Sequence, residues 1–166
     1  MRILIDADSC PKAARELVLR RAAKLSIHVI FAANRAIPSD YEIAGVKASV
    51  QMEICSAEEN SADNRLVELA EKDDLVITRD IPLAKRLVEK NAVVIDDRGR
   101  IFTANNINEI LSLRNFTVGL INDGMEFVRT ANYGKKDLKT FADSLDKIIT
   151  KNFAKPRLQG TGSESV

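Results

Sequence analysis

Short apolar runs alternate with amphipathic segments along most of this chain, and this alternation limits the folds that it can adopt. The apolar runs predict strands over residues 2–5, 28–31, 48–54, 75–78, 93–95, 101–103 and 116–121. The amphipathic segments predict helices over residues 11–25, 61–70, 81–90, 107–113 and 136–152. Strands that alternate with helices pair in parallel, because each helix carries the chain back across the sheet. The expected fold class is therefore α/β, a three-layer sandwich with a mainly parallel central sheet.

The length and composition fit one domain. The 166 residues are 45% hydrophobic and 30% charged, which is enough apolar material for one core. We expect residues 1–153 to form that domain and residues 154–166, which lack apolar periodicity, to be a disordered tail. No apolar stretch approaches the roughly 20 residues of a membrane span, and two cysteines are too few for a disulfide framework. A cytoplasmic protein without a membrane partner is expected, whereas the sequence does not indicate an oligomeric state.

The overall charge does not identify a partner. Lys and Arg number 25 against 24 Asp and Glu, which leaves a net charge of +1 and no general basic field. Residues 133–157 carry seven basic and three acidic side chains. This local surplus is compatible with a nucleic-acid backbone, but it equally fits the solvated face of an amphipathic helix, and we prefer the latter interpretation.

Polar residues gather where the predicted strands end. They are Asp6, Asp8, Asn34, Arg35, Thr78, Arg79, Asp80, Asp96, Asp97, Arg98 and Arg100. Open parallel sheets place their ligand sites along the carboxyl edge, where these residues should meet. Asp63, in the first turn of its predicted helix, would reach the same edge. Clustered carboxylates are tolerated when a hard cation neutralises them, so a Mg²⁺ or Mn²⁺ site is predicted.

A simpler interpretation applies to each aspartate taken alone. Asp8, Asp63 and Asp80 all lie at or near the start of a predicted helix. There a carboxylate can cap backbone N–H groups or interact favourably with the helix dipole, which contributes only about 0.3–1 kcal/mol. We favour the metal site because several acids converge on one edge of the sheet.

Four stretches also resemble a known family. DADSCP from residue 6, ITRDIPLA from 77, RGRIFTANNI from 98 and KDLKTFADSLD from 136 resemble the motifs of the uncharacterised bacterial YaiI/YqxD family, in the same order. More remotely, the layout resembles the PIN-like nucleases, which implies a PIN-like domain. That resemblance implies metal-binding and catalytic roles for Asp6, Asp63 and Asp80, with Asp8 beside them. PIN-like nucleases usually have one more acid between the first and third motifs, where this chain offers Asp40 and Glu42.

The residues and the resemblance together predict a metal-dependent nuclease that hydrolyses phosphodiester bonds, with single-stranded RNA a better substrate than DNA. Mg²⁺ or Mn²⁺ would be the cofactor, and water the nucleophile. Thr78, Arg79, Arg35 and Arg98 would contact the phosphate, with Asn34 and Asp97 on the rim of the site. Arginines beside aspartates are just as commonly surface ion pairs.

Two other functions stay open. Haloacid-dehalogenase-like phosphatases also open with Asp-x-Asp, which would make Asp6 the nucleophile and Asp8 the general acid. In that interpretation Thr78 would bind the phosphate and Lys85 or Lys90 would be its charge partner. Asp96 and Asp97 would be the metal ligands. That fold usually inserts a flap after its first motif, whereas this chain enters a helix at Pro11. The third alternative is a non-catalytic protein that binds nucleic acid or another partner on a PIN-like scaffold.

The cysteine and histidine content argues against a thiol nucleophile. Cys10 follows two aspartates, whose charges oppose the effect of the helix dipole on its pKa. The sole histidine, His28, belongs to a predicted strand and is expected in the core or at the sheet edge rather than as a ligand.

Overall fold

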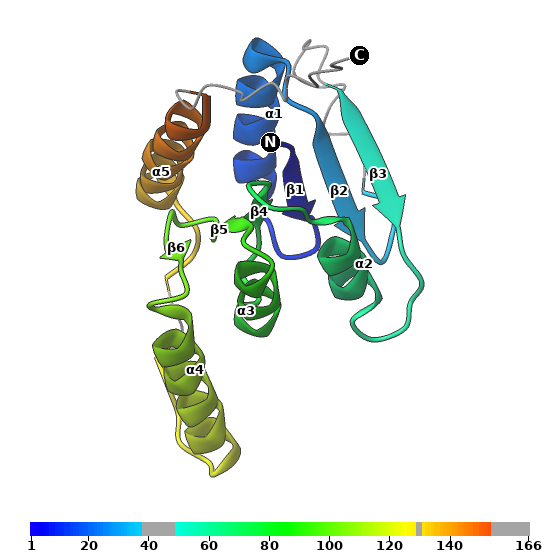
Figure 1. Cartoon of the computed structure of the whole chain (residues 1–166). Helices are drawn as coiled ribbons and strands as arrows, with labels where there is room; N and C mark the ends of the chain where they lie inside the picture. Colours follow the sequence, from blue (N-terminus) through cyan, green and yellow to red (C-terminus); the bar gives the residue numbers. More distant parts are fainter. Residues whose placement is uncertain (38–48, 129–130, 154–166) are drawn as a thin grey trace, which may run out of the picture.

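The computed structural model describes residues 1–37, 49–128 and 131–153 (Figure 1). Within them the elements are β1 (Ile3–Asp6), α1 (Lys12–Leu25), β2 (Val29–Ala33), β3 (Val50–Ile54), α2 (Ser61–Leu69), β4 (Leu75–Ile77), α3 (Ile81–Glu89), β5 (Val93–Ile95), β6 (Ile101–Phe102), α4 (Ile107–Asn122) and α5 (Lys135–Phe153). Asp40, Glu42 and the predicted tail 154–166 lie outside the described residues.

The strands form a single sheet in the order β3-β2-β1-β4-β5-β6. The first five strands in this order are parallel, and β6 pairs antiparallel with β5. The order changes direction at β1, since the chain first moves outward through β2 and β3 and then returns to place β4 on the other side of β1. A ligand site in an open parallel sheet is expected at such a switch point, at the carboxyl ends of β1 and β4.

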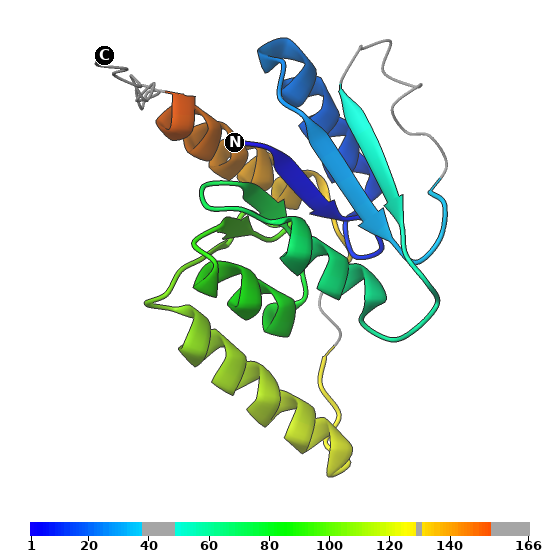
Figure 2. The same ribbon diagram turned by 45° about the vertical axis from the view of Figure 1, so that its right-hand side comes forward.

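Helices cover both faces of the sheet, which gives the predicted three layers. Ile3 and Ile5 point to the face that packs on α1 and α5. Leu4, between them, points to the opposite face and joins the core formed with α2 and α3. This alternation follows from the two-residue period of a strand. Figure 2 shows α1 and α5 on one side of the strands and α2 and α3 on the other.

Helix α5 agrees with the amphipathic interpretation of the basic segment. Phe141, Leu145, Ile148 and Ile149 are buried on the face that meets α1 and the sheet. On the same helix, Asp146 accepts hydrogen bonds from Arg21 of α1. In the described part of the chain, no helix is long and apolar enough to cross a membrane.

One predicted strand is wrong. Residues 116–121 continue α4, although Phe, Thr and Val favour strands. The start of this helix is fixed by reciprocal hydrogen bonds, because the Thr103 N–H donates to Asn106 Oδ1 and the Asn106 N–H donates to Thr103 Oγ1. Once the first turn exists, each added residue gains a hydrogen bond at little entropic cost. The gain from extending the helix therefore outweighs the strand propensity of these residues. The helix ends before Gly124, whose φ is 92°.

Candidate functional site

Asp6 lies at the centre of the candidate site, at the end of β1. Its side chain is only 5% exposed. One carboxylate oxygen, Oδ2, accepts hydrogen bonds from the Ser9 hydroxyl at 2.7 Å and from the Thr78 hydroxyl at 2.8 Å. Burial raises the pKa of Asp6, the two hydroxyls oppose that rise, and repulsion from Asp8 and Asp80 adds to it. The carboxylate is thus held firmly in a place where its charge is unfavourable.

Asp80 occupies the N-cap of α3, two residues after Thr78, which follows β4. Its Oδ1 accepts the N–H of Leu83 at 2.8 Å, and its own N–H donates to the Thr78 hydroxyl at 3.0 Å. The capping role considered from the sequence is therefore confirmed. The Thr78 hydroxyl links this helix start to Asp6, because the same oxygen donates to one aspartate and accepts from the backbone of the other.

Asp63 comes from a third element, the first turn of α2. The helix begins at Ser61, where the sequence predicted it, and Asn60 is its N-cap. The pKa of Asp63 rises from 3.8 to about 6, first through burial and then through repulsion from Asp80, Asp6 and Asp8, while Arg86 opposes the rise. Asp63 therefore lies within electrostatic range of the acids at the ends of β1 and β4.

Asp8 connects the site to the end of β2. Its Oδ2 accepts the backbone N–H of Asn34 at 2.9 Å, so that Asn34 contributes its main chain here. The guanidinium of Arg35 lies 4.0 Å from Asp8 Oδ1, and its side chain is 85% exposed. Arg35 is thus a loosely held cation at the rim.

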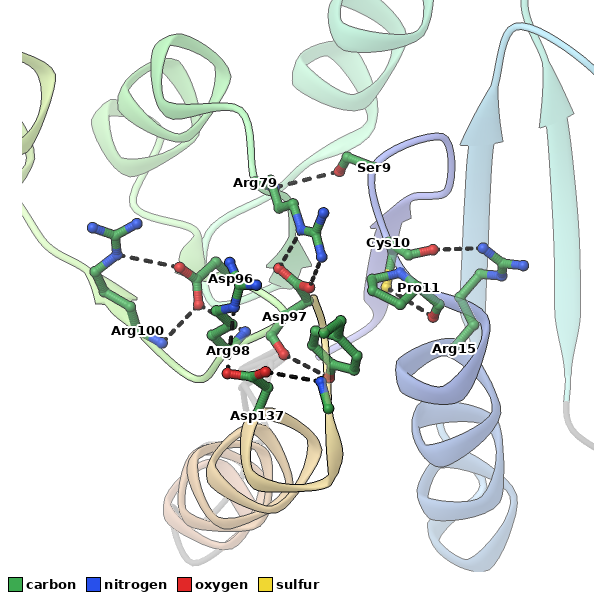
Figure 3. Close-up of polar contacts among 12 residues, drawn as sticks. Ser9, Cys10, Pro11, Arg15, Arg79, Asp96, Asp97, Arg98, Arg100 and Asp137 are labelled. Atoms are coloured by element: carbon green, nitrogen blue, oxygen red, sulfur yellow. Dashed lines mark hydrogen bonds and ion pairs between the residues drawn. The ribbon is translucent and has the colours of Figure 1, made fainter. Parts of the chain in front are cut away.

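Arg79 and Asp97 form a firm ion pair (Figure 3). Both Nε and Nη2 of Arg79 donate to the Asp97 carboxylate, the first at 2.7 Å. Arg79 also lies over the Tyr133 ring, 5.9 Å from its centre, and the Tyr133 hydroxyl donates to the Asp97 carbonyl at 2.8 Å. Arg79 therefore serves mainly to fix the end of β5, and phosphate would compete with a buried carboxylate for it.

The two arginines after β5, Arg98 and Arg100, are also paired, as Figure 3 shows. Arg98 lies 3.3 Å from Asp137 of α5 and donates to the Ala131 carbonyl at 3.1 Å. Arg100 Nε lies 3.2 Å from Asp96 Oδ2. Of the arginines predicted to contact phosphate, Arg35 has the most exposed side chain.

Three contributors to this region were not predicted: Ser9, Tyr133 and Asp137. The sequence could have indicated Ser9, because a serine hydroxyl often forms a local hydrogen bond to a residue three positions earlier, here Asp6. Tyr133 contacts Asp97 across 36 residues of sequence, a separation for which a single chain offers no pattern.

Cys10 behaves as expected, whereas His28 lies outside the strand predicted for it and is only partly buried. Cys10 is buried, and burial followed by repulsion from Asp97 raises the pKa of its thiol to about 12. His28 lies just before β2, with Nδ1 2.6 Å from the Ser49 hydroxyl at the neighbouring strand. The two side chains do not form a nucleophile–base pair.

The carboxylates suit a hard cation in chemistry but do not enclose one. Across residues 1–37, 49–128 and 131–153, no three or more His, Cys, Asp or Glu side chains are grouped so that they could hold a metal ion. Mg²⁺, however, keeps several waters and is usually held by one or two carboxylates together with substrate phosphates. Asp6, Asp8, Asp63 and Asp80 thus fit a metal as a partial set of oxygen ligands, and as no more than that.

Fold and site together define an α/β protein with an acidic site at the switch point of a mainly parallel sheet. The family model described as "Uncharacterized BCR, YaiI/YqxD family" matches residues 4–151, and the chain belongs to this family.

Curated relatives resemble the chain over most of its length. A UPF0178 protein of Treponema denticola is 43% identical over 91% of this chain and 93% of its own. A UPF0178 protein of Syntrophobacter fumaroxidans is 40% identical over 96% and 99%, and one of Pseudomonas aeruginosa is 39% identical over 91% of both chains. No solved structure matches the chain.

Proposed function

We propose that the protein is a metal-dependent nuclease that hydrolyses phosphodiester bonds, with single-stranded RNA as its preferred substrate. The observation that carries this proposal is that acids at the end of β1 and at the β4–α3 junction lie within electrostatic range of Asp63 of α2. Burial, and then repulsion from Asp80, Asp6 and Asp8, raises the pKa of Asp63 to about 6. A bound divalent cation would relieve that repulsion, and acids that repel one another at a sheet switch point are typical of catalytic sites.

Each residue of the site has a distinct task in this mechanism. Mg²⁺ or Mn²⁺ would polarise the phosphodiester and lower the pKa of a water molecule. Asp6, held by Thr78 and Ser9, presents its carboxylate in one fixed orientation at the end of β1. Asp80 would present Oδ2 to the cation, because its Oδ1 already accepts a hydrogen bond from the Leu83 N–H at the start of α3. The exposed guanidinium of Arg35 is available to hold a phosphate oxygen.

The phosphatase alternative has less support. It needs Asp96 and Asp97 as metal ligands, but Asp96 accepts hydrogen bonds from the Arg98 and Arg100 backbone and Asp97 is engaged by Arg79. The lysines that it needs are also engaged, since Lys85 donates to Asn108 of α4 and Lys90 to the Val67 carbonyl.

A non-catalytic binding module now ranks ahead of the phosphatase as the second candidate, because one observation favours it. The described residues do not include three grouped metal ligands. A protein that only binds nucleic acid would not need them.

The test is cleavage of a labelled single-stranded RNA in Mn²⁺ by the parent chain and by Asp6→Asn, Asp63→Asn and Asp80→Asn. Each of the three is expected to lose activity almost completely, because residues that act on one cation act as a unit. Asp143→Asn is the matched control, since it removes an exposed carboxylate from the outer face of α5. A generic aryl phosphate is assayed in parallel.

The outcomes separate the candidates. Turnover of the aryl phosphate that survives Asp80→Asn would refute the nuclease. If neither substrate reacts although Mn²⁺ raises the melting temperature of the parent chain, the nuclease is refuted in favour of the binding module.

A further inference from the structure

Helix α4 and the segment after it carry most of the exposed apolar surface. Of the ten exposed large hydrophobic side chains in the described part of the chain, seven lie between residues 113 and 128. Figure 1 shows α4 extending away from the sheet beyond α3. Only Ile107, at its first turn, is buried. The remainder of the helix thus projects an apolar surface away from the core.

The sequence of α4 is that of a helix that is buried on several sides. Its charged residues are Glu109 and Arg114, and residues 115–122 carry no charge. A helix that is hydrophobic around its circumference is normally covered by other structure. An apolar patch of several hundred Å² is as large as the largest patch on a typical monomer, and such a patch is often functional. The surface therefore fits an interface.

We propose that α4 is a homodimer interface, covered by α4 of a second copy of this chain. A two-fold interface places the same surface against itself, so that any net charge on it would repel its own image. Residues 115–122 of α4 avoid this repulsion, and the acids Asp123 and Glu126 lie beyond the end of the helix. Two-fold dimers are also the commonest assemblies of soluble proteins.

The exposed apolar side chains alone supply a large part of the area that a stable interface needs. The interface side chains are Leu113, Phe116, Val118, Ile121, Met125 and Phe127, which are 41–65% exposed. With about 150 Å² for each large apolar side chain, their exposed parts amount to roughly 500 Å² per copy. That is more than half of the about 800 Å² that each partner buries in a stable interface.

The shape also favours a protein partner. A hollow of about 350 Å³ lies beside α4, and its walls include the apolar Ile81, Ile110 and Leu113 together with Arg100 and Arg114. It offers a concave surface for a protruding apolar side chain of the second copy.

Two other occupants fit less well. An interfacial membrane helix carries Lys and Arg along its polar face, whereas α4 has one arginine and one glutamate. Nucleic acid would likewise require several basic residues.

The experiment measures the mass of the full chain in solution by size exclusion with light scattering. The parent chain is expected at twice the monomer mass. Ile121→Lys should reduce the mass to that of a monomer, because each copy then places a charge in the apolar interface. Ile54→Lys is the matched control: Ile54 is 61% exposed, against 50% for Ile121, but it lies on β3, at the other edge of the sheet.

Circular dichroism establishes that each variant is folded, and Phe116→Asn provides a milder second substitution. A monomeric parent chain would overturn the proposal. So would a folded Ile121→Lys or Phe116→Asn chain that keeps the dimer mass, or loss of the dimer in Ile54→Lys. Binding of a monomeric parent chain to anionic vesicles would identify a membrane as the occupant instead. The dimer is independent of the proposed nuclease activity, so the failure of one leaves the other standing.

Discussion

Removing the charge of Asp63 is expected to stabilise the metal-free protein. Burial and the repulsion from Asp80, Asp6 and Asp8 raise its pKa from 3.8 to about 6. At about 1.4 kcal/mol per pKa unit, the ionised form is disfavoured by roughly 3 kcal/mol. Solvent screening at this partly exposed site reduces the figure to about 1–2 kcal/mol. The Asp63→Asn substitution also loses a favourable interaction of about 0.3–1 kcal/mol with the N-terminus of α2. The expected net gain is therefore about 1 kcal/mol.

The pH dependence gives the prediction its sign. Below 3.8 both the folded and the unfolded chain hold the proton on Asp63, so the group does not affect stability. Between 3.8 and about 6 the unfolded chain has released the proton and the folded chain retains it. The free energy of unfolding then falls as the pH rises, and the full cost is present above about pH 6. The advantage of Asp63→Asn should thus appear only as the pH passes through this window.

Urea denaturation with a chelator present, at pH values on both sides of the window, measures the difference. Asp143→Asn controls for the removal of one negative charge from the surface, where Asp143 lies 3.5 Å from Lys139. The reasoning is refuted if Asp63→Asn is less stable than the parent chain above the window. An equal gain below and above the window would also refute it.

Three further substitutions test the supports of the site by urea denaturation. Thr78→Val should cost about 2–4 kcal/mol relative to Thr78→Ser, because one buried hydroxyl serves both Asp6 and the N–H of Asp80. Asp80→Ala should be about 1 kcal/mol less stable than Asp80→Asn, which keeps an N-cap oxygen; equal stabilities would exclude a capping role. Gly99→Ala should cost about 1–3 kcal/mol, because φ is +87° and a Cβ would lie 2.7 Å from the Thr140 carbonyl oxygen; a neutral result would mean that α5 shifts freely.

The fold could be predicted from the sequence because its signals are local. The run before Asp6 is buried throughout, and the alternation of runs with amphipathic segments implies parallel strands. The exception is α4, where β-favouring residues belong to a helix whose apolar surface the described chain leaves exposed. A pattern of hydrophobicity indicates that a segment is covered, but not whether its own chain or a second copy covers it.

The acids of the site could be predicted for the same reason, whereas its arginines could not. Asp6 ends β1 and Asp80 lies in the short connection after β4, so the topology of a parallel sheet brings them to one edge. The partner of Arg79 is Asp97, 18 residues further along the chain, and nothing near either residue indicates the pair. Competition between a phosphate and a carboxylate for one guanidinium depends on distances that only the folded chain fixes.

The capping role and the metal-binding role of these aspartates do not exclude each other. The helix start holds Asp80 by one oxygen, and Thr78 with Ser9 holds Asp6, so both carboxylates are oriented before any cation arrives. The Asp63 side chain makes no hydrogen bond or ion pair among the described residues, and burial, followed by repulsion from the other acids, raises its pKa. Asp63 is therefore the side chain that must reorient when a cation binds as proposed. This explains why the acids lie within electrostatic range of one another although, in the described residues, no three of their carboxylates are grouped around one point.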